Sequence, residues 1–292
     1  MDARAFYGLT PTDDPNQWRL PVVAELCSGL GALFGGCGLG ACLVALEATT
    51  GRPTVWATAQ YLSYARPGTM LDIDTVEVTR GHSVSQARAV ARVEGEEILT
   101  VNAAFGHRSV PFSGEWAIRP DVPGPDDCPP RILFEHHQHT IMSRLDMRLA
   151  KARDMETFPA EPGDGRAALW VRLPGLLEMS AGALAIVGDY VPFGIGQALG
   201  RRAGGNSLDN TLRIARRDPT DWVLADVRVH AVHDGFGHGL VHLWSEDGNL
   251  LGTASQSTIV RQWRGEAPAD RTPSAPGRAQ PGTPEPTEEV TP

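Results

Sequence analysis

Three side chains in the last third of the chain could bind and deprotonate a water molecule. Asp209 offers a carboxylate that can accept a proton, Gln256 an amide that donates and accepts hydrogen bonds, and His230 an imidazole that can do either. Each lies in a different run of alternating apolar and polar residues. Four such runs follow one another, separated by Asp-Pro or Asp-Gly turn sequences: residues 207–215, 222–231, 237–245 and 250–261. This pattern predicts antiparallel hairpins, so we expect the three side chains on strands of one sheet.

Two apolar stretches predict helices that other structure must enclose. One covers about residues 39–49, behind a glycine-dense passage at 29–38, and ends before Gly51, a typical C′ glycine. The other starts at Ser180, a typical N-cap residue, and continues to Val187. Neither stretch has a polar face, so both helices are expected inside a protein core.

The order of elements in the first half of the chain returns in the second half. Runs typical of strands lie at residues 17–26, 54–64, 70–79, 83–93 and 96–105, and again at 132–149 and 167–173. When the Glu-Gly turn at 94–95 is laid on the Asp-Gly turn at 247–248, the last two strands of each half superpose, which indicates a tandem duplication. Glu77 and Ala103 then take the positions of His230 and Gln256. The first half therefore lacks this pair, which predicts one active site per chain.

These patterns divide the chain into four parts. We expect an N-terminal unit at residues 1–112, a linker at 113–130, a C-terminal unit with the catalytic residues at 131–263, and a tail at 264–292. The linker region has too many prolines for regular structure: Pro120, Pro123, Pro125, Pro129 and Pro130. The tail consists mostly of Pro, Ala, Thr, Glu and Gly, so it has too little apolar surface to offset the entropy of ordering and is expected to be disordered.

Composition limits the classes of function. The 292 residues are 41% hydrophobic with a formal net charge of −9, and the basic residues are scattered, so we expect a globular protein that binds no nucleic acid. No run approaches the ~20 apolar residues of a membrane span, and the N-terminus leads into no hydrophobic signal region, so we expect a cytoplasmic protein. The four cysteines lack the spacing of a metal site. Histidines 136, 137 and 139 fit a polar strand better than a metal site, so no metal is predicted.

Four passages carry a resemblance to a known family. They are Phe34-Gly35-Gly36, the run YLSYARPG at 61–68, Ser207-Leu208-Asp209 and the run ASQSTIVR at 254–261. In order and spacing, over about residues 15–263, the chain resembles the acyl-CoA thioesterase II family. The resemblance implies an α+β chain with a double hotdog fold, in which each of two tandem units is an antiparallel sheet wrapped round a central hydrophobic helix. It also implies that such chains pair into a homo-oligomer.

The resemblance further implies an active site. In that family an Asp, a Thr or Ser and a Gln of the second hotdog hold the hydrolytic water, and the glycine-led start of a central helix faces the thioester carbonyl. Carried onto this sequence, the Asp is Asp209 and the Gln is Gln256, while the hydroxyl position falls on His230, which departs from the pattern. Backbone N–H groups near Gly36 or Gly38 would face the oxyanion. The expected reaction is hydrolysis of an acyl-CoA to free fatty acid and CoA by attack of water, with no cofactor besides the CoA of the substrate.

Other functions fit these residues less well. Residues 36–41 satisfy the dinucleotide fingerprint GxGxxA, but Trp56 stands where an acidic residue should follow. Residues 81–85 approach the serine hydrolase motif GxSxG but lack its closing glycine. An acyl-thioester hydratase would need an Asp/His pair beside the central helix, which the sequence does not place. A non-catalytic acyl-CoA or acyl-carrier binding protein stays open as the alternative, because His230 stands where the family has a hydroxyl.

Overall fold

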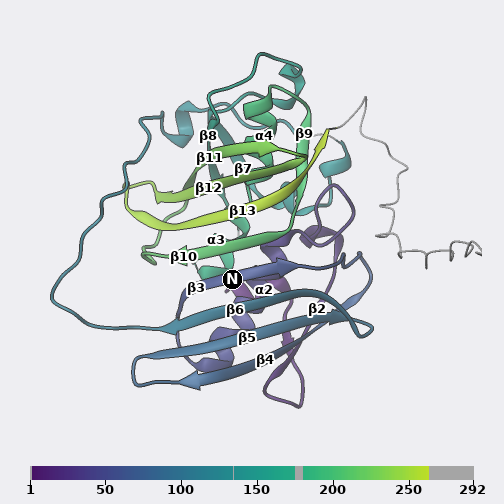
Figure 1. Ribbon diagram of the computed structural model, residues 1–292, viewed down its shortest axis with the longest axis vertical. Helices are drawn as coiled ribbons and strands as arrows, with labels where there is room; N and C mark the ends of the chain where they lie inside the picture. Colours follow the sequence, from purple (N-terminus) through teal and green to yellow (C-terminus); the bar gives the residue numbers. More distant parts are fainter. Residues whose placement is uncertain (1, 134, 175–179, 263–292) are drawn as a thin grey trace, which may run out of the picture.

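The chain forms one continuous antiparallel sheet of two similar halves joined edge to edge, as the computed structural model shows (Figure 1). Within residues 2–133, 135–174 and 180–262, which the structure describes, the sheet has 13 strands. Their order is β1-β2-β4-β5-β6-β3-β10-β13-β12-β11-β8-β7, and β9 pairs with β13 beside this path. The first half contains β1 (Thr10–Pro11), β2 (Gln17–Pro21), β3 (Thr54–Tyr61), β4 (Met70–Arg80), β5 (Val84–Val93) and β6 (Glu96–Gly106). The second half contains β7 (Asp146–Lys151), β8 (Arg166–Arg172), β9 (Ala203–Ser207), β10 (Asp209–Ile214), β11 (Val223–His233), β12 (Phe236–Ser245) and β13 (Leu250–Gln262).

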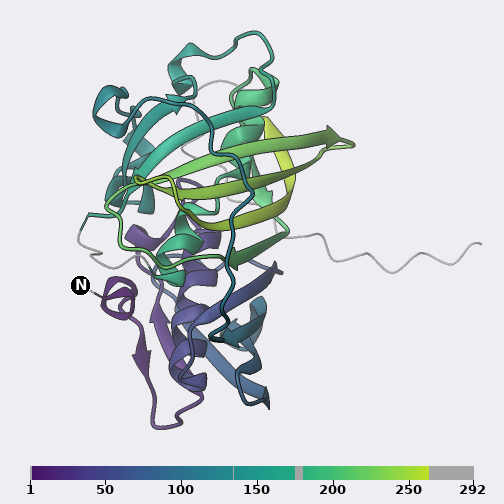
Figure 2. The same cartoon turned by 90° about the vertical axis from the view of Figure 1, so that its left-hand side faces the viewer.

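Each half of the sheet curls around apolar helices (Figure 2). The described helices are α1 (Ala3–Tyr7), α2 (Gly35–Thr50), α3 (Ala181–Val187) and α4 (Val191–Leu199). Short 3-10 turns lie between the elements: η1 (Ala24–Leu26), η2 (Pro125–Asp127), η3 (Glu135–His137), η4 (Ile141–Arg144) and η5 (Met155–Thr157). In α2, Leu39, Leu43 and Leu46 are fully buried, and each buried leucine contributes roughly 2 kcal/mol to stability. The two predicted helices are confirmed as the centres of the two halves, with α2 beginning at Gly35, earlier than expected.

The second helical region is broken in the middle. Ser180 caps α3 by accepting a hydrogen bond from the Ala183 N–H, as predicted. Pro192, at the start of α4, lacks the N–H that would continue the helix from α3, so the chain turns at Asp189. The stretch Ala181–Leu199 is long and apolar enough to cross a membrane by composition, yet 78% of its most apolar window is buried inside the protein. This burial is typical of a core helix.

Glycines allow the helices of the two halves to cross in backbone contact. A Cβ atom at Gly36 would lie 2.5 Å from the Ala185 carbonyl oxygen, and one at Gly40 would lie 2.8 Å from the Gly182 carbonyl oxygen. Gly36 and Gly40 are four residues apart, so they share one face of α2, and that face meets α3. The crossing places the start of α2 beside the break between α3 and α4.

The strand predicted at 207–215 is interrupted. Leu208 separates β9 from β10, although both strands pair with β13. The ladder therefore skips a position, and the Asp209 carboxylate accepts a hydrogen bond at 2.7 Å from the Ser257 N–H in the interruption. Strand periodicity did not reveal this break because the residues on both sides keep their alternation.

Two further predictions need correction. The strand expected at 132–149 is wrong for most of its length, because η3 and η4 occupy residues 135–137 and 141–144 and only Asp146–Lys151 is a strand. Thr140 explains part of the difference, since its hydroxyl caps η4 by accepting the Met142 N–H. The polar strand expected for the three neighbouring histidines is replaced by the same turns. Similarly, the strand expected at 17–26 ends at Pro21, and η1 follows.

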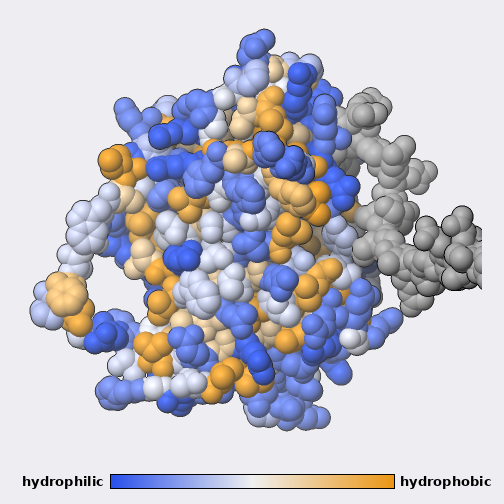
Figure 3. Space-filling view, in the orientation of Figure 1, coloured by the Kyte–Doolittle hydropathy of each residue, from blue (hydrophilic) through white to orange (hydrophobic). Residues whose placement is uncertain are grey.

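The proline-rich segment after β6 forms no described strand and crosses the outside of the second half. The Trp170 indole N–H donates to the Pro123 carbonyl at 2.9 Å, which fixes the end of this segment on the sheet. Earlier in the segment, Phe112, Trp116 and Ile118 are exposed, and the segment arches away from the body at the left of Figure 3. The four-part division of the chain stays a prediction in its detailed boundaries, and the tail expected at 264–292 lies outside the described residues.

Candidate active site

A buried carboxylate lies where the two halves meet. Asp189, in the turn between α3 and α4, is 6% exposed. Its Oδ2 accepts a hydrogen bond at 2.6 Å from the Gly36 N–H at the start of α2, and its Oδ1 accepts one from Gln256 Nε2. Gly36 belongs to the first half, while Asp189 and Gln256 belong to the second. The carboxylate is thus held by both halves of the sheet.

The amide of Gln256 is fixed by three hydrogen-bonding groups. Its Oε1 accepts the Val191 N–H at 3.0 Å, and its Nε2 donates both to Asp189 and to Ser207 Oγ at 2.8 Å. The Val191 N–H is at the start of α4, so the amide joins β13 to that helix. With both ends of the amide engaged, its NH₂ group must face the carboxylate and the hydroxyl. A carboxylate, a hydroxyl and an amide therefore form one cluster.

Burial changes the acidity of this cluster. It raises the pKa of Asp189 from 3.8 to about 7, and the hydrogen bonds from Gly36 and Gln256 oppose the effect only in part. A carboxyl with a pKa near 7 is about half in its basic form at pH 7, and that form binds a proton more strongly than an ordinary aspartate does. It is therefore suited to take a proton from water.

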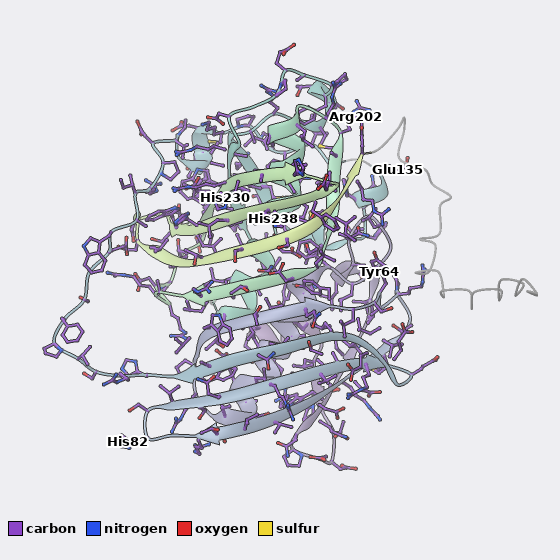
Figure 4. All side chains as sticks on the ribbon, in the orientation of Figure 1. Tyr64, His82, Glu135, Arg202, His230 and His238 are labelled. Carbon is purple, nitrogen blue, oxygen red and sulfur yellow. The ribbon has the colours of Figure 1, made fainter. Side chains whose placement is uncertain are left out.

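The structure brings together only part of the site expected from sequence. Gln256 and Gly36 lie in the cluster. Asp209 instead accepts the Ser257 N–H, which satisfies the ladder interruption. His230 is exposed on β11, at a bulge of that strand (Figure 4). Gly38 donates its N–H to the Phe34 carbonyl within α2 at 3.0 Å.

Sequence reasoning missed Asp189 and Ser207. Asp189 is the one charged residue in the stretch Ala181–Leu199, and a lone acid in an apolar helical region was a usable signal, because a buried carboxylate needs partners. Ser207 lies inside a passage that already carried the resemblance, two residues before Asp209. A hydroxyl of the kind that the resemblance implies therefore lies beside Gln256, and a catalytic role of His230 stays a prediction.

The pairing of the two halves also bears on the number of sites. Thr58 and Thr211 lie opposite each other on β3 and β10, with their hydroxyl oxygens 2.8 Å apart. If these two residues are taken as equivalent positions of the two halves, the strand pairings make Thr54 equivalent to Ser207 and Ala103 equivalent to Gln256. The first half keeps a hydroxyl but has no amide, which supports one such cluster per chain.

Comparison with protein families identifies both halves. The family description "Acyl-CoA thioesterase N-terminal domain" matches residues 24–106, and "Acyl-CoA thioesterase C-terminal domain" matches residues 125–260. Together the two matches cover well over half of the chain. None of the curated proteins compared with the chain matches it.

Solved structures agree with this result. A candidate thioesterase from Novosphingobium aromaticivorans is 30% identical, with a TM-score of 0.75 over 85% of this chain and 96% of that one. A protein with a hot dog fold from Alicyclobacillus acidocaldarius is 23% identical, with a TM-score of 0.78 over 90% and 98%. The acyl-CoA thioesterase II of Mycobacterium marinum is 20% identical, with a TM-score of 0.69 over 90% and 100%. The last two support the fold, and the double hotdog predicted from sequence is confirmed.

Proposed function

The chain belongs to the acyl-CoA thioesterase family, and from that premise we propose that it hydrolyses an acyl-CoA to a free fatty acid and CoA by direct attack of water. The observation that carries the proposal is the buried Asp189 carboxylate, whose pKa is raised to about 7 and which shares the Gln256 amide with the Ser207 hydroxyl. These are the three kinds of group that hold the hydrolytic water in the family that the sequence resembles. In this proposal the carboxylate is Asp189 rather than Asp209, and the hydroxyl is Ser207 rather than His230.

The reaction needs a base, a positioned water and a stable leaving group. Asp189 takes a proton from the water as its oxygen bonds to the thioester carbon, and Ser207 and Gln256 orient that water. The carbonyl oxygen becomes an oxyanion. When the carbonyl re-forms, the carbon–sulfur bond breaks and the CoA thiolate takes the proton from Asp189. The products are the free acid and CoA, and Asp189 returns to its basic form.

The non-catalytic alternative depended on His230. It assumed that replacing the family hydroxyl had disabled the site, but His230 is exposed on β11, and the hydroxyl of Ser207 bonds to Gln256. The ground for expecting lost activity is therefore removed. Operation without a metal or redox cofactor, pairing into a homo-oligomer and a cytoplasmic location remain our proposals, supported by the sequence and the family resemblance.

The test is release of free CoA thiol from short, medium, long and branched acyl-CoAs. We expect the wild type to hydrolyse at least one of these classes and Asp189→Asn to lose about 10²–10⁴-fold in kcat while still folded. Asp209→Asn and His230→Ala are the matched controls, and each should keep activity within about tenfold. If Asp209→Asn lost as much as Asp189→Asn, the choice of base would be wrong. If the wild type bound acyl-CoA with a raised Tm but released no thiol, the binding alternative would replace hydrolysis.

A further inference from the structure

The two backbone N–H groups of α2 that the sequence suggested as oxyanion donors have other partners in the structure. The Gly36 N–H is held by the Asp189 carboxylate at 2.6 Å, and the Gly38 N–H by the Phe34 carbonyl at 3.0 Å. Both N–H groups that the sequence suggested as oxyanion donors are therefore already engaged. A hydrolytic site still needs a donor aimed at the oxygen where negative charge develops.

Tyr61 brings a hydroxyl to this place from the first half. It ends β3, and its N–H donates to the Leu208 carbonyl at 3.0 Å, at the interruption between β9 and β10. A Cβ atom at Gly35 would lie 3.0 Å from Tyr61 Oη and 2.8 Å from Asp189 Oδ2. The phenol and the carboxylate thus approach the same point at the start of α2, where only a glycine leaves room for both.

The Tyr61 hydroxyl is buried and uncommitted. Among the residues that the structure describes, no group forms a hydrogen bond with it. Burial, followed by the negative charge of Asp189, raises the pKa of Tyr61 well above its ordinary value, so the phenol keeps its proton. A buried donor without an acceptor destabilises the fold, so the Tyr61 hydroxyl is available to a partner such as a ligand oxygen.

Asn210 gives a second sign of a polar place on the same inner face. It is 1% exposed, and neither atom of its amide has a hydrogen-bond partner in the described part of the protein. Asn210 lies opposite Ala59 on β3, and Tyr61 is two residues further along that strand. The two side chains are therefore diagonal neighbours on this face of the sheet.

We propose that Tyr61 is a catalytic residue whose phenol O–H donates a hydrogen bond to the thioester carbonyl oxygen as the water attacks. The inference rests on the proposed hydrolysis and extends it. The phenol stabilises the oxyanion without giving up its proton, and the bond weakens when the carbon–sulfur bond breaks and the carbonyl re-forms. The first hotdog would then supply the oxyanion donor, and the second hotdog the base.

The first experiment compares Tyr61→Phe with the matched variant Tyr64→Phe. The Tyr64 hydroxyl accepts a hydrogen bond from Asn206 and belongs to no part of the proposed machinery. We expect Tyr61→Phe to lower kcat about 10²–10³-fold with KM changed less than about threefold, and Tyr64→Phe to keep the wild-type rate. The Tm of Tyr61→Phe should be equal to or above that of the wild type, because the substitution removes an unpartnered buried hydroxyl.

A binding measurement separates an oxyanion role from a structural one. The probes are a trifluoromethyl ketone analogue of acyl-CoA, which carries an oxyanion-like oxygen, and a thioether analogue without a carbonyl. Tyr61→Phe should weaken the first probe by about the same factor as kcat and leave the second unchanged. Equal affinity of both proteins for the ketone, or a kcat within about threefold of wild type, would overturn the role of Tyr61 while Asp189→Asn still tests hydrolysis. A folded wild type that hydrolyses no acyl-CoA would overturn the proposed function and this inference together.

Discussion

Replacing Asp189 with Asn should make the stability of the protein less sensitive to pH between about pH 4 and pH 7. Burial raises the pKa of this carboxyl from 3.8 to about 7 in the native state, whereas in the unfolded chain it titrates as an ordinary aspartate. Within that window the native state binds a proton that the unfolded state has lost. Raising the pH therefore lowers the free energy of unfolding by about 1.4 kcal/mol per unit, about 4 kcal/mol in all. Asn has no such proton and is free of this loss.

The measurement is urea unfolding followed by tryptophan fluorescence at several values between about pH 5 and pH 8. At each pH the free energy of unfolding of the wild type is subtracted from that of Asp189→Asn, which cancels the titration of every group common to both proteins. The difference should rise by about 2.5 kcal/mol from about pH 5 to pH 8 and level off as the pH passes above about 7. The stability of Asp189→Asn relative to the wild type should thus be greatest where the wild-type carboxylate is charged.

Asp164→Asn is the control, because the pKa of Asp164 is shifted in the opposite direction. Asp164 is exposed, and its hydrogen bond from Lys151, together with one from the Arg166 N–H, lowers its pKa. The stabilisation that the charged Asp164 carboxylate provides is complete at pH values above the ordinary pKa of aspartate. It is lost only as the pH falls through the lowered pKa of the folded state. The difference between Asp164→Asn and the wild type should therefore be flat across the same window.

A flat difference for Asp189→Asn as well would refute the reasoning. It would mean that the Asp189 carboxyl titrates alike in the folded and unfolded chains, so burial would not have made it a stronger base. The assignment of Asp189 as the proton acceptor would then lose its physical ground, even if the substitution reduced activity.

Three further results are expected. The kcat/KM of the wild type should fall as the pH drops below about 7, because Asp189 must be unprotonated to accept a proton, and a profile that stays level down to about pH 5 would contradict this. Gln256→Ala should reduce kcat about 10²-fold with little effect on KM, measured by thiol release, since it frees the water and the carboxylate from their shared donor. Gly36→Ala should destabilise the protein by more than about 2 kcal/mol, because its Cβ would lie 2.5 Å from a carbonyl oxygen of α3, whereas Gly124→Ala, with open space around it, should leave the Tm unchanged.

The parts of the fold that sequence predicted are those with a local pattern. An apolar stretch without a polar face required enclosure, and α2 and α3 are buried as expected. Alternating runs with Asp-Gly or Glu-Gly turns defined β5, β6, β12 and β13 closely. The strand prediction at 132–149 was wrong because its apolar residues lie in successive short turns. Their spacing in the sequence does not distinguish such turns from a strand.

Local sequence patterns do not distinguish Asp189, the proposed base, from Asp209. Each is the single acidic residue of its stretch, a predicted strand for Asp209 and an apolar helical region for Asp189, and the passage around Asp209 carried the family resemblance. What separates them is the interruption at Leu208, which turns the Asp209 carboxylate to the Ser257 N–H, and the crossing of α2 over α3, which brings Gly36 to Asp189. Both depend on contacts between residues far apart in the sequence, so a single sequence gives no pattern for them.

The geometry also explains why a duplicated chain needs both halves for one site. The second half supplies the carboxylate, the hydroxyl and the amide, but the N–H that holds the carboxylate comes from Gly36 in the first half. The first half has Ala103 in place of the amide and so builds no matching cluster of its own. Its helix start must nevertheless stay close to Asp189, because withdrawing that N–H would remove a hydrogen bond from a buried carboxylate and raise its pKa further. In the proposed site, the first hotdog therefore contributes through Gly36, whose N–H holds the carboxylate of the second.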